Sequence, residues 1–239
     1  MTASAAPSKR EAIVEALMRL ASDRPWRDIE IGDIAREAGV SLVEFRDLFP
    51  SKGAVLGGFS RMIDGRVLAG MTDELADEPA RERMFDMVMR RLDALTPYKR
   101  ALRRITFALR QDPFSLAALN RVALNSQRFM LAAAGISTEG HLGGLKLQGA
   151  VLVFGRTLET WLDDEDPGLA RTMARLDREI RRGERILERA EDFRRLTTPI
   201  RVLGLALLER GRRRGERMRR DRFEDEPRDD DMRDPAAAI

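Results

Sequence analysis

Few residues of this chain have the types and spacing that metal or acid–base chemistry needs. His141 is the only histidine and there is no cysteine, so one chain cannot build a multi-histidine or thiolate metal site. The acidic run over residues 163–166 could bind a cation, but it lacks the glycine-punctuated alternation of a calcium loop. Because Pro167 follows this run, we expect the acids to lie at the positive end of the next helix. The sequence therefore predicts no metal, no cofactor and no enzyme.

The composition favours a helical protein. Hydrophobic residues make up 43% of the chain and aromatic residues 5%, and the apolar content is mostly Leu, Ala, Val and Met. Most of these residue types favour helices, which predicts an all-α fold. The absence of cysteine suits a reducing compartment, and neither a secretion signal nor a membrane span is visible. We expect a cytoplasmic protein.

Three short helices are expected near the N-terminus. Ser8 and Glu11 form a capping box that begins a helix over about 9–22. A second helix over about 31–38 ends at Gly39, and a third over about 41–49 begins with the Ser41–Glu44 capping box and stops before Pro50. Lengths of this kind, joined by tight turns, predict a helix-turn-helix DNA-binding domain over 8–55.

The rest of the chain reads as a larger helical domain. Acidic or capping residues followed by proline mark most of its helix starts. The helices that we expect lie at about 52–75, 80–94, 97–110, 114–134, 139–163, 167–192 and 199–220. We therefore predict about six helices in a dimerisation and ligand-binding domain over 56–220, followed by a disordered acidic tail over 221–239.

The stretch from Ile29 to Leu56 resembles the signature of the TetR family of helix-turn-helix transcriptional regulators. The matching elements are Asp33-Ile34-Ala35, Ala38-Gly39-Val40-Ser41, Phe45, Phe49 and Ser51-Lys52. The resemblance implies a ligand-responsive regulator that acts as a homodimer on a near-palindromic operator. It also implies a small hydrophobic effector bound by residues 80–195 and dimerisation through the long helices over about 139–192.

The same resemblance assigns DNA contacts to the third helix and the start of the fourth. The candidate residues are Ser41, Leu42, Val43, Glu44, Arg46 and Lys52. Arg46 and Lys52 can reach phosphates, whereas Glu44 either completes the capping box or accepts a hydrogen bond from a cytosine amine. The chain departs from the family at Glu30, where Ser or Thr is usual, and over residues 43–46.

Charge is distributed unevenly for a DNA-binding protein. Residues 1–65 carry 9 basic and 10 acidic side chains, whereas residues 171–220 carry 17 arginines against 8 acids. Residues 221–239 carry 8 acids against 3 arginines. A protein that binds the phosphate backbone usually has a positive footprint, and the predicted DNA-binding domain lacks one.

A second resemblance favours an alternative function. Residues 157–167 and 172–178 are similar to the C-terminal part of ubiquinone-biosynthesis lipid-binding proteins, which have the TetR fold with a vestigial helix-turn-helix. In those proteins a terminal amphipathic helix meets the membrane, and residues 199–214 offer apolar residues followed by arginines for such a peripheral contact. The competing interpretation of 199–214 is a last core helix.

Two further sets of residues, one of glycines and one of methionines and phenylalanines, each allow two structural interpretations. The glycines of the helix expected over 139–163 allow close packing across a dimer or space for a ligand: Gly143, Gly144, Gly149 and Gly155. A set of flexible or aromatic side chains either lines an effector cavity or belongs to the core: Met84, Met87, Met89, Phe107, Phe114, Phe129 and Met130.

Overall fold

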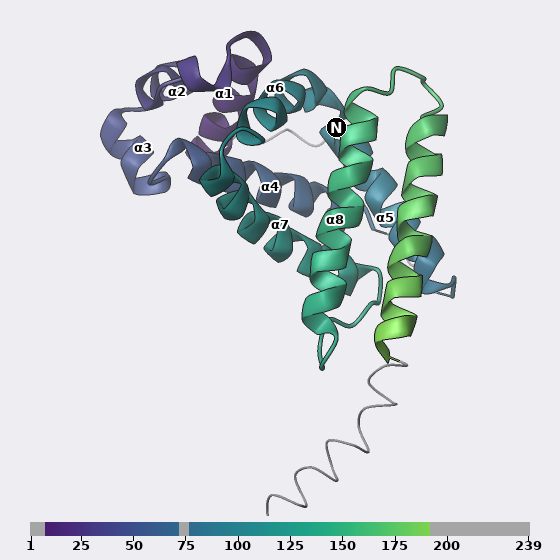
Figure 1. Ribbon diagram of the computed structural model, residues 1–239. Helices are drawn as coiled ribbons and strands as arrows, with labels where there is room; N and C mark the ends of the chain where they lie inside the picture. Colours follow the sequence, from purple (N-terminus) through teal and green to yellow (C-terminus); the bar gives the residue numbers. More distant parts are fainter. Residues whose placement is uncertain (1–7, 72–76, 192–239) are drawn as a thin grey trace, which may run out of the picture. The chain divides into compact units, whose positions relative to one another are not determined.

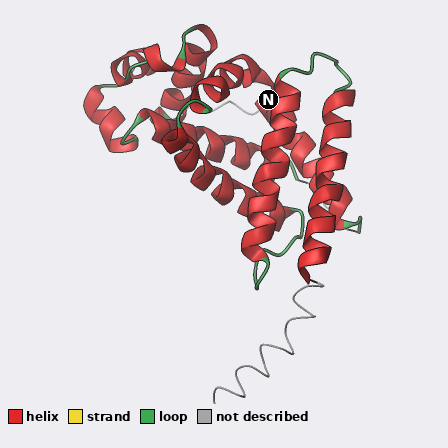
Figure 2. Cartoon of the chain, in the orientation of Figure 1, coloured by secondary structure: helices red, strands yellow, loops and turns green. Residues whose placement is uncertain are grey.

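The computed structural model describes residues 8–71 and 77–191, which are helical with no strand in those ranges (Figures 1 and 2). The described residues up to 187 form one compact unit. The predicted helix over 199–220, the membrane contact at 199–214 and the acidic tail lie outside the described residues. The all-α prediction is confirmed.

Of the N-terminal helices, the first and the third begin where their capping boxes predict. They are α1 (Lys9–Asp23), the 3-10 turn η1 (Trp26–Asp28), α2 (Ile31–Ala38) and α3 (Leu42–Leu48). At the start of α1 the Ser8 hydroxyl accepts from the Glu11 N–H at 3.3 Å, and the Glu11 carboxylate accepts from the Ser8 N–H at 2.9 Å. We call residues 8–49 the head.

The remaining helices follow the predicted order with shifted ends. They are α4 (Lys52–Ala69), α5 (Ala80–Leu95), the 3-10 turn η3 (Thr96–Tyr98), α6 (Lys99–Leu109), α7 (Pro113–Ala133), α8 (Gly143–Leu162) and a last helix over 170–191. Figure 1 shows α8 and the last helix side by side, and an ion pair between Arg156 and Glu179 joins them at 2.8 Å.

Three predicted helix boundaries were wrong: one C-terminal end and two starts. The fourth helix does not run to 75, because it ends at Ala69 and the capping residue Gly70 has a non-helical ψ of 8°. The helix expected from 139 begins at Gly143, where a turn brings the Thr138 carbonyl so close that an added Cβ would lie 1.8 Å from its oxygen. The helix expected from 167 begins at residue 170, after Leu169 with its left-handed φ of 51°.

A polar contact ties the head to the helices behind it. The Tyr98 hydroxyl donates to Glu15 of α1 at 2.5 Å and accepts from Arg66 of α4 at 2.9 Å. The edge of the Tyr98 ring packs on Phe59 of α4, with the centroids 4.9 Å apart. Because α4 also packs on α5 and α7, it joins the head to the larger helical region. The predicted boundary between residues 55 and 56 stays a prediction.

A buried ion pair links α4, α5 and α7 deeper in the fold. The Arg91 guanidinium of α5 contacts the Asp64 carboxylate of α4, and both side chains are at most 10% exposed. The Ser126 hydroxyl of α7 donates to the same carboxylate at 2.8 Å. Removing one member of a buried pair costs far more than removing a surface charge, so this contact fixes the packing of three helices.

The acidic run over 163–166 lies where helix capping predicts. The Asp164 carboxylate, almost fully buried, accepts from the Thr172 N–H at 3.0 Å and the Thr172 hydroxyl at 2.7 Å. The Asp166 carboxylate accepts from the N–H groups of Gly168 at 3.1 Å and Ala170 at 3.2 Å. Hydrogen bonds, chiefly from Thr172, lower the pKa of Asp164. The capping interpretation is confirmed, and no acid or histidine cluster suited to a metal occurs in the described residues.

The side chains proposed as core or cavity lining divide into two groups. Met84, Met87 and Met130 are buried members of the hydrophobic core. Met89 is partly buried against that core. Phe107, Phe114 and Phe129 are instead 68%, 88% and 50% exposed, so the core interpretation was wrong for these three. Among the described residues no helix is long and apolar enough to cross a bilayer.

Candidate nucleic-acid interface

The inner face of α3 anchors this helix to the head. The chain leaves α2 through Gly39, whose φ of 67° lies in the left-handed region that glycine tolerates, and re-enters helix at Leu42. Phe45 and Phe49 are buried beneath α3. Gly58 of α4 allows Phe49 to approach, because a Cβ at position 58 would lie 2.7 Å from the Phe49 ring. α3 is therefore held by aromatic packing on one side only.

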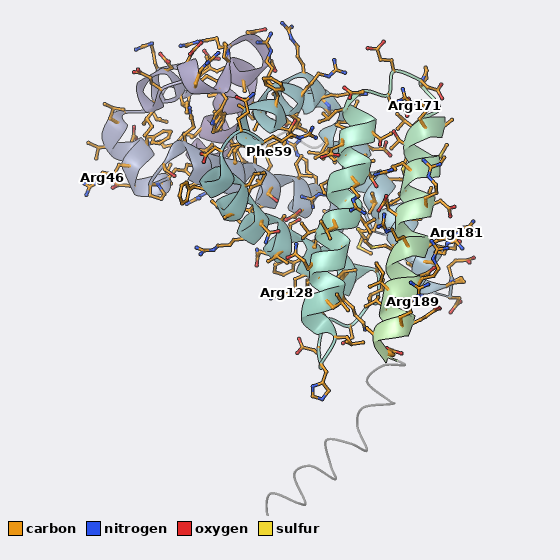
Figure 3. All side chains as sticks on the ribbon, viewed as in Figure 1. Arg46, Phe59, Arg128, Arg171, Arg181 and Arg189 are labelled. Carbon is orange, nitrogen blue, oxygen red and sulfur yellow. The ribbon has the colours of Figure 1, made fainter. Side chains whose placement is uncertain are left out.

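The outer face of α3 is presented to solvent. Leu42 is 62% exposed and Val43 is 69% exposed, although both are apolar. Arg46 is also exposed, and it has no ion-pair partner within residues 8–71 and 77–191. Figure 3 shows the Arg46 side chain extending outward from α3, away from the other helices. These three side chains can read a groove: the apolar pair can contact thymine methyl groups, and the arginine can contact guanine or phosphate.

The Glu44 carboxylate forms hydrogen bonds with other residues of the head. Its carboxylate accepts from the Ser41 N–H at 2.7 Å and the Ser41 hydroxyl at 2.9 Å, which confirms the predicted capping box. The Lys9 ammonium at the start of α1 donates to the other carboxylate oxygen at 2.5 Å. Lys9, together with the Ser41 hydrogen bonds, lowers the pKa of Glu44 to about 2. The carboxylate is therefore ionised at neutral pH with its charge compensated.

The Lys52 side chain, at the start of α4, packs against the head rather than reaching into solvent. Its ammonium donates to the carbonyls of Trp26 at 2.6 Å and Ile29 at 2.8 Å, and it lies 4.3 Å from the Trp26 ring centroid. Partial burial lowers the pKa of Lys52. Lys52 thus satisfies carbonyls in the link between α1 and α2 and fixes that link to the start of α4. Its role as a phosphate contact stays a prediction.

Most other cations of the head are paired with acids. The pairs are Arg19–Glu37 at 2.8 Å, Arg24–Asp33 at 3.1 Å and Arg36–Asp33 at 3.2 Å. Asp33 also accepts from the Glu30 N–H at 3.2 Å, so it supplies half of a capping box at the start of α2 despite the departure at Glu30. These pairs compensate much of the positive charge of the head by direct contact.

Two cations near α3 were not found from the sequence. Lys9 lies 35 residues before Glu44, and the Arg10 guanidinium lies 4.6 Å from the Phe49 ring centroid. Neither contact has a local sequence signal, because each depends on how α1 packs against α3. The single available hint was that two cations begin the first helix.

Comparison with solved structures decides the fold. A TetR transcriptional regulator from Nitrosomonas europaea ATCC 19718 matches with a TM-score of 0.58 and 23% identity, covering 73% of this chain and 97% of that one. A TetR transcriptional regulator from Rhodococcus sp. RHA1 matches with a TM-score of 0.52 and 19% identity, covering 73% and 95%. The chain has the TetR fold. No protein-family model and no curated protein matches it.

The same comparisons give no support to the second resemblance. The likeness of residues 157–178 to ubiquinone-biosynthesis lipid-binding proteins is not reflected in the neighbours, which are TetR regulators by name. Within the TetR fold of this chain, the acids at 163–166 have a structural role as helix caps.

Proposed function

We propose that this protein is a TetR-like transcriptional regulator that binds a near-palindromic operator as a homodimer. The observation that carries the proposal is the exposed face of α3, where Leu42 and Val43 lie in solvent beside Arg46. Leu42 and Val43 are adjacent, so they form a small apolar patch bordered by the polar residues of α3, and such a patch can serve as an interaction site. A short helix anchored by its inner face and open on its outer face suits insertion into a major groove.

The residues on and near this face have different proposed roles, which follow from their chemistry. Leu42 and Val43 contact base edges through their methyl groups, and Arg46 makes the polar contact that selects a base or phosphate. Lys9, paired with Glu44 close to α3, offsets the charge of that carboxylate where the backbone of the duplex passes. Ser41 and Glu44 position α3 rather than read the sequence.

In the proposed homodimer, the outer face of α8 forms the interface between the two copies. Leu145 and Leu152 are exposed seven positions apart, and they fall on the same face of the helix. Gly144, Gly149 and Gly155 have nothing within 4 Å of a built Cβ, so packing inside the described chain does not require them. A second copy that approaches closely at these glycines accounts for them. A hydrophobic effector bound by residues 80–195 would act on the spacing of the two heads.

The experiment that tests the proposal is fluorescence anisotropy of the full chain on an operator recovered from genomic DNA. Arg46→Ala is expected to weaken operator binding by about 1–3 kcal/mol if Arg46 reads a base, and to relax specificity at that base pair. Arg128→Ala serves as the control, because Arg128 is also exposed and unpaired among the described residues but lies on α7 (Figure 3). Equal losses for both variants would contradict recognition by α3.

A further inference from the structure

The last helix carries a row of arginines on one side. At 3.6 residues per turn, Arg171, Arg178, Arg182 and Arg185 fall within an arc of about 60°. Between residues 171 and 187, every position of the helix inside that arc is an arginine. All four side chains are exposed, and they extend over about 21 Å along the axis at 1.5 Å per residue. We call these four residues the arginine row.

The acids around the arginine row do not neutralise it by direct contact. Its members form no ion pair with any residue in 8–71 or 77–191, although Arg171 and Arg182 contribute to lowering the pKa values of Asp164 and Glu179. The ion pairs within this helix involve arginines outside the row. Arg175 pairs with Glu179 at 3.2 Å, and Arg181 pairs with Asp177 at 2.9 Å.

The spacing of the arginine row is unfavourable for the isolated helix. Arg178 and Arg182 are four positions apart, and Arg182 and Arg185 are three apart, so like charges are neighbours on the helix surface. An anion bound along the row would turn this repulsion into attraction. The head offers a contrast, since most of its cations already have acidic partners.

We propose that the arginine row binds the sugar–phosphate backbone of nucleic acid, as a second contact surface separate from α3. Guanidinium groups match phosphate geometry bidentately, and duplex DNA presents about 12 phosphates over a length of 21 Å. A membrane fits less well, because a helix that binds a bilayer places large apolar side chains beside its cations. The exposed apolar residues of this helix, Met173 and Ile186, fall outside the arc of the row.

The test compares two full-length variants with equal changes in charge. One is R178Q/R182Q/R185Q in the arginine row. The control is R104Q/R121Q/R128Q on α6 and α7, where the arginines are also exposed and without an ion pair among the described residues. Binding to a random-sequence duplex is measured by anisotropy over a range of KCl concentrations, and sedimentation reports the oligomeric state.

The row variant is expected to lower the slope of log K against log[KCl] by about 2 to 3 units, because each lost phosphate contact removes about 0.9. The control variant should leave the slope unchanged. The charge-conserving variant R178K/R182K/R185K should keep most of the wild-type slope. The proposal is overturned by an unchanged slope, by an equal fall in the control, or by a row variant that becomes monomeric, which would assign the row to a dimer interface.

Two further arms separate this proposal from other readings. Vesicles with and without phosphatidylserine test the membrane: loss of vesicle binding in the row variant with duplex binding intact would overturn the proposal. Operator recognition by Arg46 is measured separately on the same proteins. Failure of the arginine row therefore shows as an unchanged salt slope, whereas failure of the regulator function shows as no sequence preference.

Discussion

Glu44 is the residue whose role changes most once its surroundings are known. On sequence alone its charge opposes phosphate binding, but Lys9 and Ser41 compensate that charge in the folded head. Glu44→Gln keeps a capping partner for Ser41 and releases Lys9. We expect non-specific DNA binding to tighten and the salt slope to rise by up to about one unit, since one more cation can reach a phosphate.

The control for that prediction is Lys9→Gln, which removes the same ion pair without freeing a cation. It should weaken non-specific binding, and the two variants should therefore move in opposite directions. If Glu44→Gln instead relaxes specificity at a single base pair, Glu44 reads a cytosine and its position near Lys9 is incidental.

The low pKa of Glu44 also predicts a dependence of stability on pH. Its folded value of about 2 lies below the ordinary 4.5, so the ionised form stabilises the folded protein. This contribution is fully present above about pH 4.5 and is lost as the pH falls towards 2. The difference in urea midpoint between wild type and Glu44→Gln should shrink over that window. A constant difference would show that the carboxylate charge does not matter.

A substitution at Lys52 distinguishes a structural role of this residue from a contact with DNA. Lys52→Met removes the Lys52 donor from both carbonyls, and only Trp26 keeps another, the Ile29 N–H at 3.4 Å. We expect the free energy of unfolding to fall by about 1–3 kcal/mol, the cost of leaving partly buried polar groups unsatisfied. Thermal unfolding measures this loss, and the salt slope of DNA binding should not change. A slope lowered by about one unit at unchanged stability would make Lys52 a phosphate contact instead.

Residues differ in how far the sequence could predict them. The capping role of Glu44 follows from its spacing of three from Ser41, which is a local signal. The partners of Lys9 and Lys52 lie 23 to 35 residues away, and they are brought together only by the packing of α1 and α4 on the rest of the head. Local rules carry no information about contacts at that separation.

At the scale of elements, helix starts that carry a capping serine were predicted correctly, whereas three other helix boundaries were missed. Ser8, Ser41 and Ser51 each accept from a backbone N–H three residues on, as the sequence indicates. The end of α4 at Ala69 was missed, because Gly70 is followed by residues that are themselves compatible with helix. The late starts of α8 and the last helix depend on left-handed backbone at Gly140 and Leu169.

The glycines of α8 make a prediction about association. Gly149 has free space around a built Cβ, so Gly149→Ala should stabilise an isolated chain by about 1 kcal/mol through helix propensity. If a second copy packs closely there, the same change should weaken the dimer. Leu152→Glu should break the dimer outright, and Leu116→Glu on α7, similarly exposed, is the control.

Sedimentation at micromolar concentration measures both effects. We expect a wild-type dimer, a dimer that dissociates more readily for Gly149→Ala, and a monomer for Leu152→Glu. Tighter association of Gly149→Ala would show that the dimer face lies elsewhere. Gly143 is not informative in this test, because the nearby Thr138 carbonyl already requires a glycine.

At the scale of the whole molecule, α4 joins the head to the larger helical region, because it packs on α1, α5 and α7. The contacts of Tyr98 with Glu15 and Arg66 connect the two regions directly, so a rearrangement around α4 can reach the head. Because most cations of the head are paired with acids, the proposed regulator needs more than one contact surface on a duplex. A second head and the arginine row are the two surfaces that we propose.

Recovery of genomic DNA fragments by the intact protein, followed by sequencing, tests the central claim most directly. The account predicts enrichment of a near-palindromic site with two half-sites about one helical turn, or a multiple of it, apart. Arg46→Ala should abolish the enrichment of that site, whereas Arg128→Ala should not. Wild-type protein that enriches no sequence and shows no affinity for any duplex at low salt would contradict the account.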